Sequence, residues 1–126
     1  MSPLVNIAAR GWIGTGDNVL IGGFIIRGSA PVKILVRATG PSLSTLGVTG
    51  AVSDTMLELY QGATVIAMND DWKSAQQSEL QATGYPPTND KESAILVTLA
   101  PGAYTTIVRG KAAGTGVGLV EALLMQ

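Results

Sequence analysis

The 126-residue sequence contains no cysteine and no histidine. Without cysteine, the chain forms no disulfide, holds no thiolate metal site and offers no cysteine nucleophile. The absence of cysteine does not distinguish an oxidising from a reducing compartment. Without histidine, it lacks the commonest general base, the usual zinc ligand and the side chain that titrates near neutral pH. Its serines lack a histidine partner, and Gly14-Thr15-Gly16 lacks the spacing of a phosphate-binding loop. These absences predict a protein that is not an enzyme and has no organic cofactor.

Charged residues are scarce, at 13% of the chain, and the formal net charge is −1. The eight basic residues are scattered, so the sequence shows no electrostatic footprint for nucleic acid or an anionic membrane. No apolar run approaches the roughly 20 residues that a membrane helix needs. We therefore expect no nucleic-acid partner and no membrane insertion. The first four residues also lack the basic and apolar regions of a signal peptide.

The pattern that remains is one of short apolar and β-branched runs, separated by many of the 16 glycines and 6 prolines. Strands this frequent, with almost no helix between them, favour antiparallel sheets packed face to face. The sequence therefore predicts an all-β fold, a single antiparallel, jelly-roll-like β-sandwich over residues 1–126. About eight strands are expected, at residues 4–9, 19–27, 32–38, 56–60, 64–68, 94–99, 103–109 and 117–124.

Three short linkers predict hairpins, because each joins two strand-like runs through glycine-containing turns. These linkers are residues 28–31, 61–63 and 100–102. Residues 40–54 are expected to have little regular structure. One short helix is predicted over residues 75–82, capped by Ser74 and ended by Gly84.

All four arginines end an apolar run, and side-chain alternation places each on the same face as the residue two positions earlier. In three of these strands, the residues on the opposite face are apolar too, so the strand is apolar on both faces. One interpretation is that these strands are central, that a helix or long loops cover their second face, and that the arginines pair with acids such as Glu58, Asp71 or Glu121. The other is that a neighbouring domain or subunit covers this face or an open strand edge.

The second interpretation predicts an assembly interface with copies of the chain or with neighbouring modules. Two observations support it: three strands are apolar on both faces, and both ends of the sequence are apolar. Residues 122–126 in particular are apolar, whereas a linker to another module would normally be polar. The residues predicted to form this interface are Leu4, Ile7, Ile25, Leu35, Ile107 and Leu123.

Two clusters of oxygen-bearing side chains are candidates for a hard cation such as calcium, which takes six to eight oxygen ligands. Asn69, Asp70 and Asp71 follow one strand, and Asp90 belongs to the second cluster, residues 89–92. The alternative is that Asn69 and Asp70 form side-chain-to-backbone turns while Asp71 pairs with an arginine. Adjacent aspartates would point apart in an extended chain, so a pair of catalytic carboxylates is not indicated.

A polysaccharide is a further candidate ligand, because aromatic rings stack on sugars in many binding sandwiches. The chain has only six aromatic residues. Most are expected in core and loop packing, and the ones that a sugar platform would use are Trp12, Tyr60, Trp72 and Tyr85.

Four segments resemble the bacterial pre-peptidase C-terminal family, at residues 54–60, 65–71, 99–110 and 114–121. Members of that family are small β-sandwich domains appended to secreted enzymes. The resemblance implies an extracellular or cell-surface module, and some relatives bind calcium, which supports the Asn69 to Asp71 loop as a site.

Segments 4–7, 14–24, 37–43 and 69–72 also resemble uncharacterised repeat units of large secreted bacterial proteins. Such units are similar to adhesion or surface-structure modules without an active site. Our leading hypothesis is therefore a structural or adhesive subunit that self-associates or packs against neighbours through strand edges, with a filament as one outcome. The alternative is an accessory module of a secreted hydrolase that binds carbohydrate or protein and is stabilised by calcium.

Overall fold

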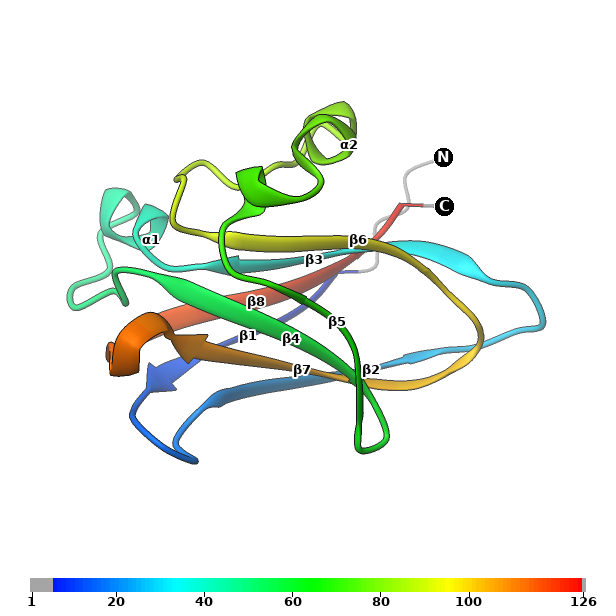
Figure 1. Cartoon of the computed structure of the whole chain (residues 1–126), viewed down its shortest axis with the longest axis horizontal. Helices are drawn as coiled ribbons and strands as arrows, with labels where there is room; N and C mark the ends of the chain where they lie inside the picture. The colour runs from blue at the N-terminus through cyan, green and yellow to red at the C-terminus, as the bar shows by residue number, and fades with distance from the viewer. Residues whose placement is uncertain (1–5, 126) are drawn as a thin grey trace.

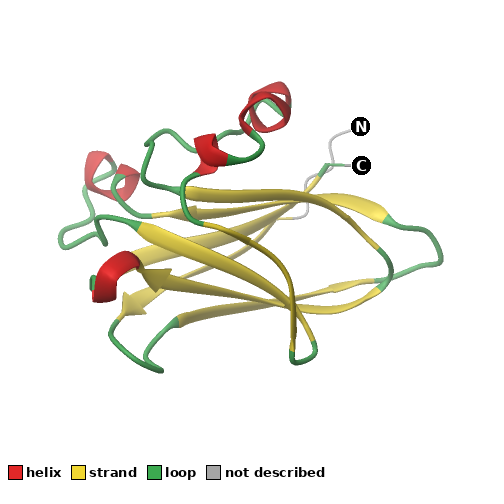
Figure 2. Ribbon diagram, viewed as in Figure 1, coloured by secondary structure: helices red, strands yellow, loops and turns green. Residues whose placement is uncertain are grey.

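The computed structural model describes residues 6–125, which form two four-stranded sheets packed face to face (Figures 1 and 2). Sheet A has the order β1-β8-β3-β6 and sheet B the order β2-β7-β4-β5, and every pairing between these strands is antiparallel. This is the strand order of a jelly roll, and it confirms the predicted fold class. The strands are β1 (Asn6–Ile13), β2 (Leu20–Ile26), β3 (Val32–Thr39), β4 (Thr55–Gln61), β5 (Thr64–Asn69), β6 (Ser93–Leu99), β7 (Gly102–Gly110) and β8 (Gly116–Leu124).

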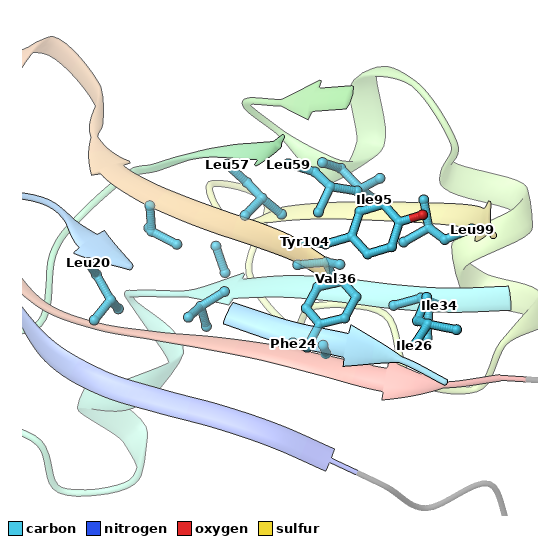
Figure 3. Close-up of a cluster of buried hydrophobic side chains, with 14 of the residues drawn as sticks. Leu20, Phe24, Ile26, Ile34, Val36, Leu57, Leu59, Ile95, Leu99 and Tyr104 are labelled. Atoms are coloured by element: carbon cyan, nitrogen blue, oxygen red, sulfur yellow. The ribbon is translucent and has the colours of Figure 1, made fainter. Parts of the chain in front are cut away.

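The main core lies between the two sheets, because alternate residues of each strand point inward. Figure 3 shows these side chains meeting across the gap between the layers. The rings of Phe24 and Tyr104 stack there with their centroids 5.6 Å apart. Both sheets contribute buried aliphatic side chains to this core, including Leu20, Ile26, Ile34, Val36, Leu57, Leu59, Ile95 and Leu99.

Of the three predicted hairpins, only the one joining β4 and β5 is present, with a register shift between Leu59 and Tyr60. The other two predictions are wrong, because β2 and β3, like β6 and β7, lie in different sheets. The linker at residues 28–31 carries the chain across the sandwich, so that inward side chains of β2 and β3 face one another. At residues 100–102 the corner is held by the Tyr104 hydroxyl, which donates to the Ala100 carbonyl over 2.6 Å. Linker length permits a hairpin, but burial of both inner faces decides the pairing.

Four short helical segments lie at the periphery of the sheets (Figure 2). The predicted helix is present in shortened form as α2 (Gln77–Ala82), preceded by the 3₁₀ turn η1 (Trp72–Ser74). Ser74 does not cap α2, since its hydroxyl donates to the Asp71 carbonyl within η1. Residues 40–54, expected to be irregular, include the one-turn helix α1 (Ser42–Thr45), and a second 3₁₀ turn, η2 (Lys111–Ala113), follows β7.

A second, smaller core covers part of the outer face of sheet A. Trp72 from η1 and Leu80 from α2 pack there on Leu35, Ala94 and Leu123, which β3, β6 and β8 supply. Figure 1 shows these two helical segments lying over β6. The first interpretation of the doubly apolar strands therefore holds for sheet A, because helix and loop cover its second face.

Two arginines pair with acids as expected. Arg37 and Glu121 lie opposite each other on β3 and β8, with Nη2 and Oε1 2.8 Å apart. Arg109 on β7 pairs with Glu58 on β4, with Nε and Oε1 3.0 Å apart. Hydrogen bonding to Glu58 raises the pKa of Arg109, so this arginine remains charged at every relevant pH.

Candidate functional sites

An acidic cluster forms at one end of sheet B from two segments that the β4–β5 hairpin brings together. Asp54 precedes β4, and Asp70 and Asp71 follow β5. Each of the three contributes a carboxylate oxygen, and these oxygens all lie within 4.8 Å of one another. The hairpin register explains the meeting, because Leu57 pairs with Asn69 and the next residues outward approach each other.

Lys111, in η2, supplies a positive charge to this cluster. Its Nζ lies 2.6 Å from Asp70 Oδ2, and its backbone N–H donates to the Asp54 carbonyl over 3.1 Å. One carboxylate oxygen of Asp54 and one of Asp70 are buried without a hydrogen-bond partner among residues 6–125. Three carboxylates against one close lysine leave excess negative charge, which is the environment that a hard cation requires.

The electrostatics of Asp54 agree with this excess of negative charge. Burial raises the pKa of Asp54 above its ordinary value, and the charges of Asp71 and Asp70 raise it further, while Lys111 and Lys91 oppose the shift. Because folding raises this pKa, the folded chain holds the proton more tightly than the unfolded chain. The contribution of Asp54 to stability therefore falls as the pH rises from the ordinary carboxyl range through the raised pKa.

We predict that Asp54→Asn stabilises the metal-free protein at pH 7, because it removes a repelled charge that lies partly in solvent. The gain should be small, about 0.5–1 kcal/mol, and should shrink near pH 3.5, where the wild-type Asp54 is largely protonated in both the folded and the unfolded chain. Urea unfolding in chelator at the two pH values measures the difference. Equal effects at both pH values would contradict the assignment.

Of the four residues predicted as metal ligands, Asp70 and Asp71 lie in the cluster, whereas Asn69 and Asp90 make other contacts. Asn69 bridges β5 and β6, since its Oδ1 accepts from the Ala94 N–H and its Nδ2 donates to the Asp71 carbonyl. Asp90 is exposed and pairs with Lys73, with Oδ1 and Nζ 2.8 Å apart. The expected side-chain-to-backbone turn at Asn69 is therefore present. The sequence predicts an arginine partner for Asp71, whereas the ion pair in this loop joins Asp70 to Lys111. Asp54 was missed, although the predicted hairpin register would have placed it there.

The outer face of sheet B exposes several large apolar side chains. They are mainly Ile21 and Ile25 on β2 and Val65 and Met68 on β5, and Ile25 and Met68 are 62% and 60% exposed. The half-buried Ile107 and the Glu58–Arg109 ion pair lie between these strands. No helix among residues 6–125 covers this face, in contrast to the outer face of sheet A. Large apolar side chains exposed together on one face often mark an interaction site.

The structure corrects the predicted assembly interface. Leu35 and Leu123 are buried under Trp72 and Leu80, so they are not available to a partner. Leu4 lies outside the described residues. Ile25 and Ile107 do lie on the uncovered face of sheet B. Ile7 instead lines a groove of about 180 Å³ between the sheets, together with Phe24, Ile26, Ile34 and Leu124.

The four aromatic residues weighed as a sugar platform do not share one face. Trp72 is buried in the second core, while Trp12 is 63% exposed on β1 in sheet A. Tyr60 lies on β4 in sheet B, and Tyr85 is in the loop after α2, where its carbonyl accepts from Arg37. A flat sugar-binding surface that uses all four rings is therefore excluded by the fold.

The fold is that of a small jelly-roll module. Helical segments cover part of the outer face of sheet A, and among the described residues none covers that of sheet B. No protein-family model matches the sequence, and a comparison with curated proteins finds no relative. The fold is similar to the pre-peptidase C-terminal domain of collagenase from Bacillus anthracis, with a TM-score of 0.57 and 13% identity. That match covers 94% of this chain and 89% of the other, and it confirms at the level of fold the resemblance seen in the sequence.

Two carbohydrate-active enzymes share more distant likeness. A family GH115 4-O-methyl-α-glucuronidase matches with a TM-score of 0.40 and 15% identity over 93% of this chain and 14% of the enzyme. A cycloisomaltooligosaccharide glucanotransferase from Paenibacillus matches with a TM-score of 0.40 and 10% identity over 99% of this chain and 18% of the enzyme.

Within the described residues, no helix has the length and apolarity needed to cross a membrane.

Proposed function

We propose that this chain is a non-catalytic structural or adhesive module that works outside the cell by associating with copies of itself or with neighbouring modules. The observation that carries the proposal is the uncovered apolar outer face of sheet B, formed by Ile21, Ile25, Val65 and Met68. Its strands carry only two charged residues, Glu58 and Arg109, which pair with each other. The face thus presents apolar side chains around an internally neutralised ion pair, which suits burial against a second protein surface.

The experiment is to measure the mass of the purified chain by light scattering across a hundredfold dilution, together with electron microscopy of the same samples. Oligomers that dissociate on dilution, or regular assemblies, are expected. Uniform monomers at every concentration would overturn the proposal.

We predict that Met68→Lys weakens this association at least about tenfold, because it places a lysine in a surface that association would dehydrate. Met68 is 60% exposed, so a lysine there keeps its charge in solvent and the monomer should keep its stability. The control is Thr98→Glu, on the exposed outer side of β6 opposite Lys33. An equal loss of association in both variants would count against the sheet B face.

A second candidate function is an accessory module that binds carbohydrate or protein for a secreted hydrolase and is stabilised by calcium. The specific observation in its favour is the Asp54, Asp70 and Asp71 cluster, with its unpartnered buried oxygens. A ligand that binds only the folded state raises its stability by about 2.7 kcal/mol at a hundredfold excess over Kd. For a chain of this size, that shift corresponds to roughly 10 °C in Tm.

We predict that calcium raises the Tm of the chain relative to chelator, and that Asp71→Asn abolishes the shift because it removes one of the three converging carboxylates. Asp90→Asn is the matched control, since Asp90 lies at the surface beside Lys73 and should leave the shift unchanged. Thermal melts of the three proteins decide the question. A calcium shift lost in Asp90→Asn but kept in Asp71→Asn would refute the assignment.

A further inference from the structure

Four strands form the edges of the two sheets, and three of these edges carry features that hinder pairing with another chain. The edge of β6 is occupied by Gln76, whose side-chain amide both donates to the Leu96 carbonyl over 2.9 Å and accepts from the Leu96 N–H over 3.0 Å. Asn69 blocks the same edge by accepting from the Ala94 N–H. Side chains there stand in for a neighbouring strand.

The edges of β5 and β1 are hindered in other ways. The β4–β5 pairing is irregular between Leu59 and Tyr60, which distorts the edge beside it. β1 carries the exposed charge of Arg10. Charge and irregularity are both common means by which proteins keep edge strands from pairing.

β2 has none of these protections. Its sequence, Leu-Ile-Gly-Gly-Phe-Ile-Ile, contains no charged residue and no proline, and its register with β7 is regular over all seven residues. Among residues 6–125, no strand pairs with its outer edge. An extended edge strand with free backbone donors and acceptors is a template for a further strand.

We propose that this edge pairs with β2 of a second copy of the chain, antiparallel and centred on Gly23, so that one continuous eight-stranded sheet crosses the dimer. The inference rests on the proposed function, because it names a second copy as the partner and adds a contact at the β2 edge of sheet B; Met68, on the opposite edge strand β5, lies outside this contact. A two-fold axis at Gly23 places Ile21 opposite Ile25 of the other copy, and Leu20 opposite Ile26. Inward residues thus meet inward residues, and outward residues meet outward ones.

The sequence of β2 favours a second copy over an unrelated strand. Ile21 and Ile25 are 57% and 62% exposed, and the two-fold makes them cross-strand neighbours twice, once on each side of the axis. Cross-strand pairs of β-branched residues are among those that stabilise sheets. Gly23, at the centre, brings no side chain into the contact, so the two backbones meet without a clash.

Charges that flank β2 are also complementary under this two-fold. The same register places the exposed Arg27 of one copy opposite Val19 of the other, two residues from the exposed Asp17. Asp17 lies in the turn that precedes β2, so each end of the pairing has a cation and an anion in adjacent segments, and no two charged residues oppose each other within the paired strands. The groove between the sheets, lined by Ile7 and Phe24, opens on this side of the sandwich and would be covered by the second copy.

Because the chain has no cysteine, single substitutions to cysteine report the register directly. Opposed residues of an antiparallel pair have Cα atoms roughly 4.5–5.5 Å apart, within the range that a disulfide spans. Gly23→Cys should therefore form a covalent dimer under mild oxidation. A side chain fits there in the monomer, since a Cβ on Gly23 would meet only the Tyr104 carbonyl oxygen, at 3.7 Å.

Ile21→Cys is the matched control on the same strand and the same exposed face. In the proposed register its two copies are four residues apart, roughly 13 Å, and should not crosslink alone. A mixture of Ile21→Cys with Ile25→Cys should crosslink, because these positions face each other. Non-reducing gels and mass spectrometry of the linked peptides give the readout.

The outcomes separate this inference from the proposed function. Crosslinking of Gly23→Cys and of the mixture, but not of Ile21→Cys alone, is the expected result. If the wild-type chain associates while Gly23→Cys fails to crosslink, or Ile21→Cys crosslinks alone as readily, the β2 register is wrong and the proposed function stands. If the wild-type chain is monomeric at every concentration, both are overturned.

Discussion

Replacing Glu92 by leucine is expected to lower the free energy of unfolding by about 3–5 kcal/mol, a large part of the stability of a single domain. Glu92 is only 1% exposed. Its Oε2 accepts from the backbone N–H groups of Gly40 and Ser42, each over 2.9 Å, and its Oε1 accepts from the Ser42 hydroxyl and the Asn89 N–H. Leucine leaves these donors without their acceptor, including the buried Gly40 N–H, and each donor that stays buried and unpaired costs about 1–3 kcal/mol.

Equilibrium unfolding in urea measures this loss, because the midpoint falls while the slope stays constant if the fold is unchanged. Glu92→Gln should lose less, since it keeps one carbonyl oxygen as an acceptor. Glu79→Gln, at an exposed position on α2, is the control and should change stability by less than about 0.5 kcal/mol. A Glu92→Leu variant as stable as the control would show that the loop hydrogen bonds contribute little.

The role of Glu92 also shows where the sequence misled. In the sequence, residues 89–92 look like a cluster of cation ligands because they combine an amide and two carboxylates. In the fold, Glu92 instead joins the loop before α1 to the loop before β6, and Asn89 contributes its backbone to the same network. Because the Glu92 carboxylate is buried, it accepts hydrogen bonds from the backbone and does not face a solvent cation. Its burial depends on Gly40 and Ser42, which lie about 50 residues away in the chain.

Strand positions were predictable because they depend on local properties, namely apolar runs bounded by glycine and proline. The strand partners were less so. In a jelly roll most connections cross between the sheets, so a short linker such as residues 28–31 joins strands that face each other across the core. The β4–β5 hairpin was predicted correctly because here the local turn and the global order agree.

The candidate sites were predicted in part for the same reason. Asp70 and Asp71 were identified because they are adjacent in sequence, whereas Asp54 joins them only through the register of β4 and β5. Ile25 and Leu35 occupy equivalent positions in their strands, two residues before an arginine. One is exposed and the other buried, because Trp72 and Leu80 come from a segment that covers only sheet A.

Trp72→Ala is expected to cost about 3–5 kcal/mol of stability, comparable to Glu92→Leu. The side chain is 5% exposed and packs with Leu80 on Leu35 and Leu123, and its Nε1 donates to the Asn89 carbonyl over 3.1 Å. Removing the ring leaves a cavity between η1 and the sheet and takes away one of the two hydrogen bonds to the Asn89 carbonyl, which still accepts from the Glu92 N–H. The expected loss is therefore partly packing and partly hydrogen bonding.

Trp12→Ala is the control that the chain itself provides, because its two tryptophans differ in burial. Trp12 is 63% exposed, and its replacement should change stability by less than about 0.5 kcal/mol. Trp12→Ala also leaves Trp72 as the one fluorophore of its kind, so its emission should stay that of a buried indole. If the two alanine variants unfold at the same urea concentration, the second core does not stabilise the fold as argued.

The same substitution links stability to association. With Trp72 removed, Leu35 and Leu123 lose part of their cover, and the outer face of sheet A becomes more apolar and more open, although Leu80 still packs on it. We therefore expect Trp72→Ala to gain binding of an apolar dye and to form larger assemblies than the wild type, since two faces now favour burial. Adding Met68→Lys to Trp72→Ala should remove only the sheet B contribution. Assemblies unchanged by this second substitution would show that the sheet B face does not contribute to them.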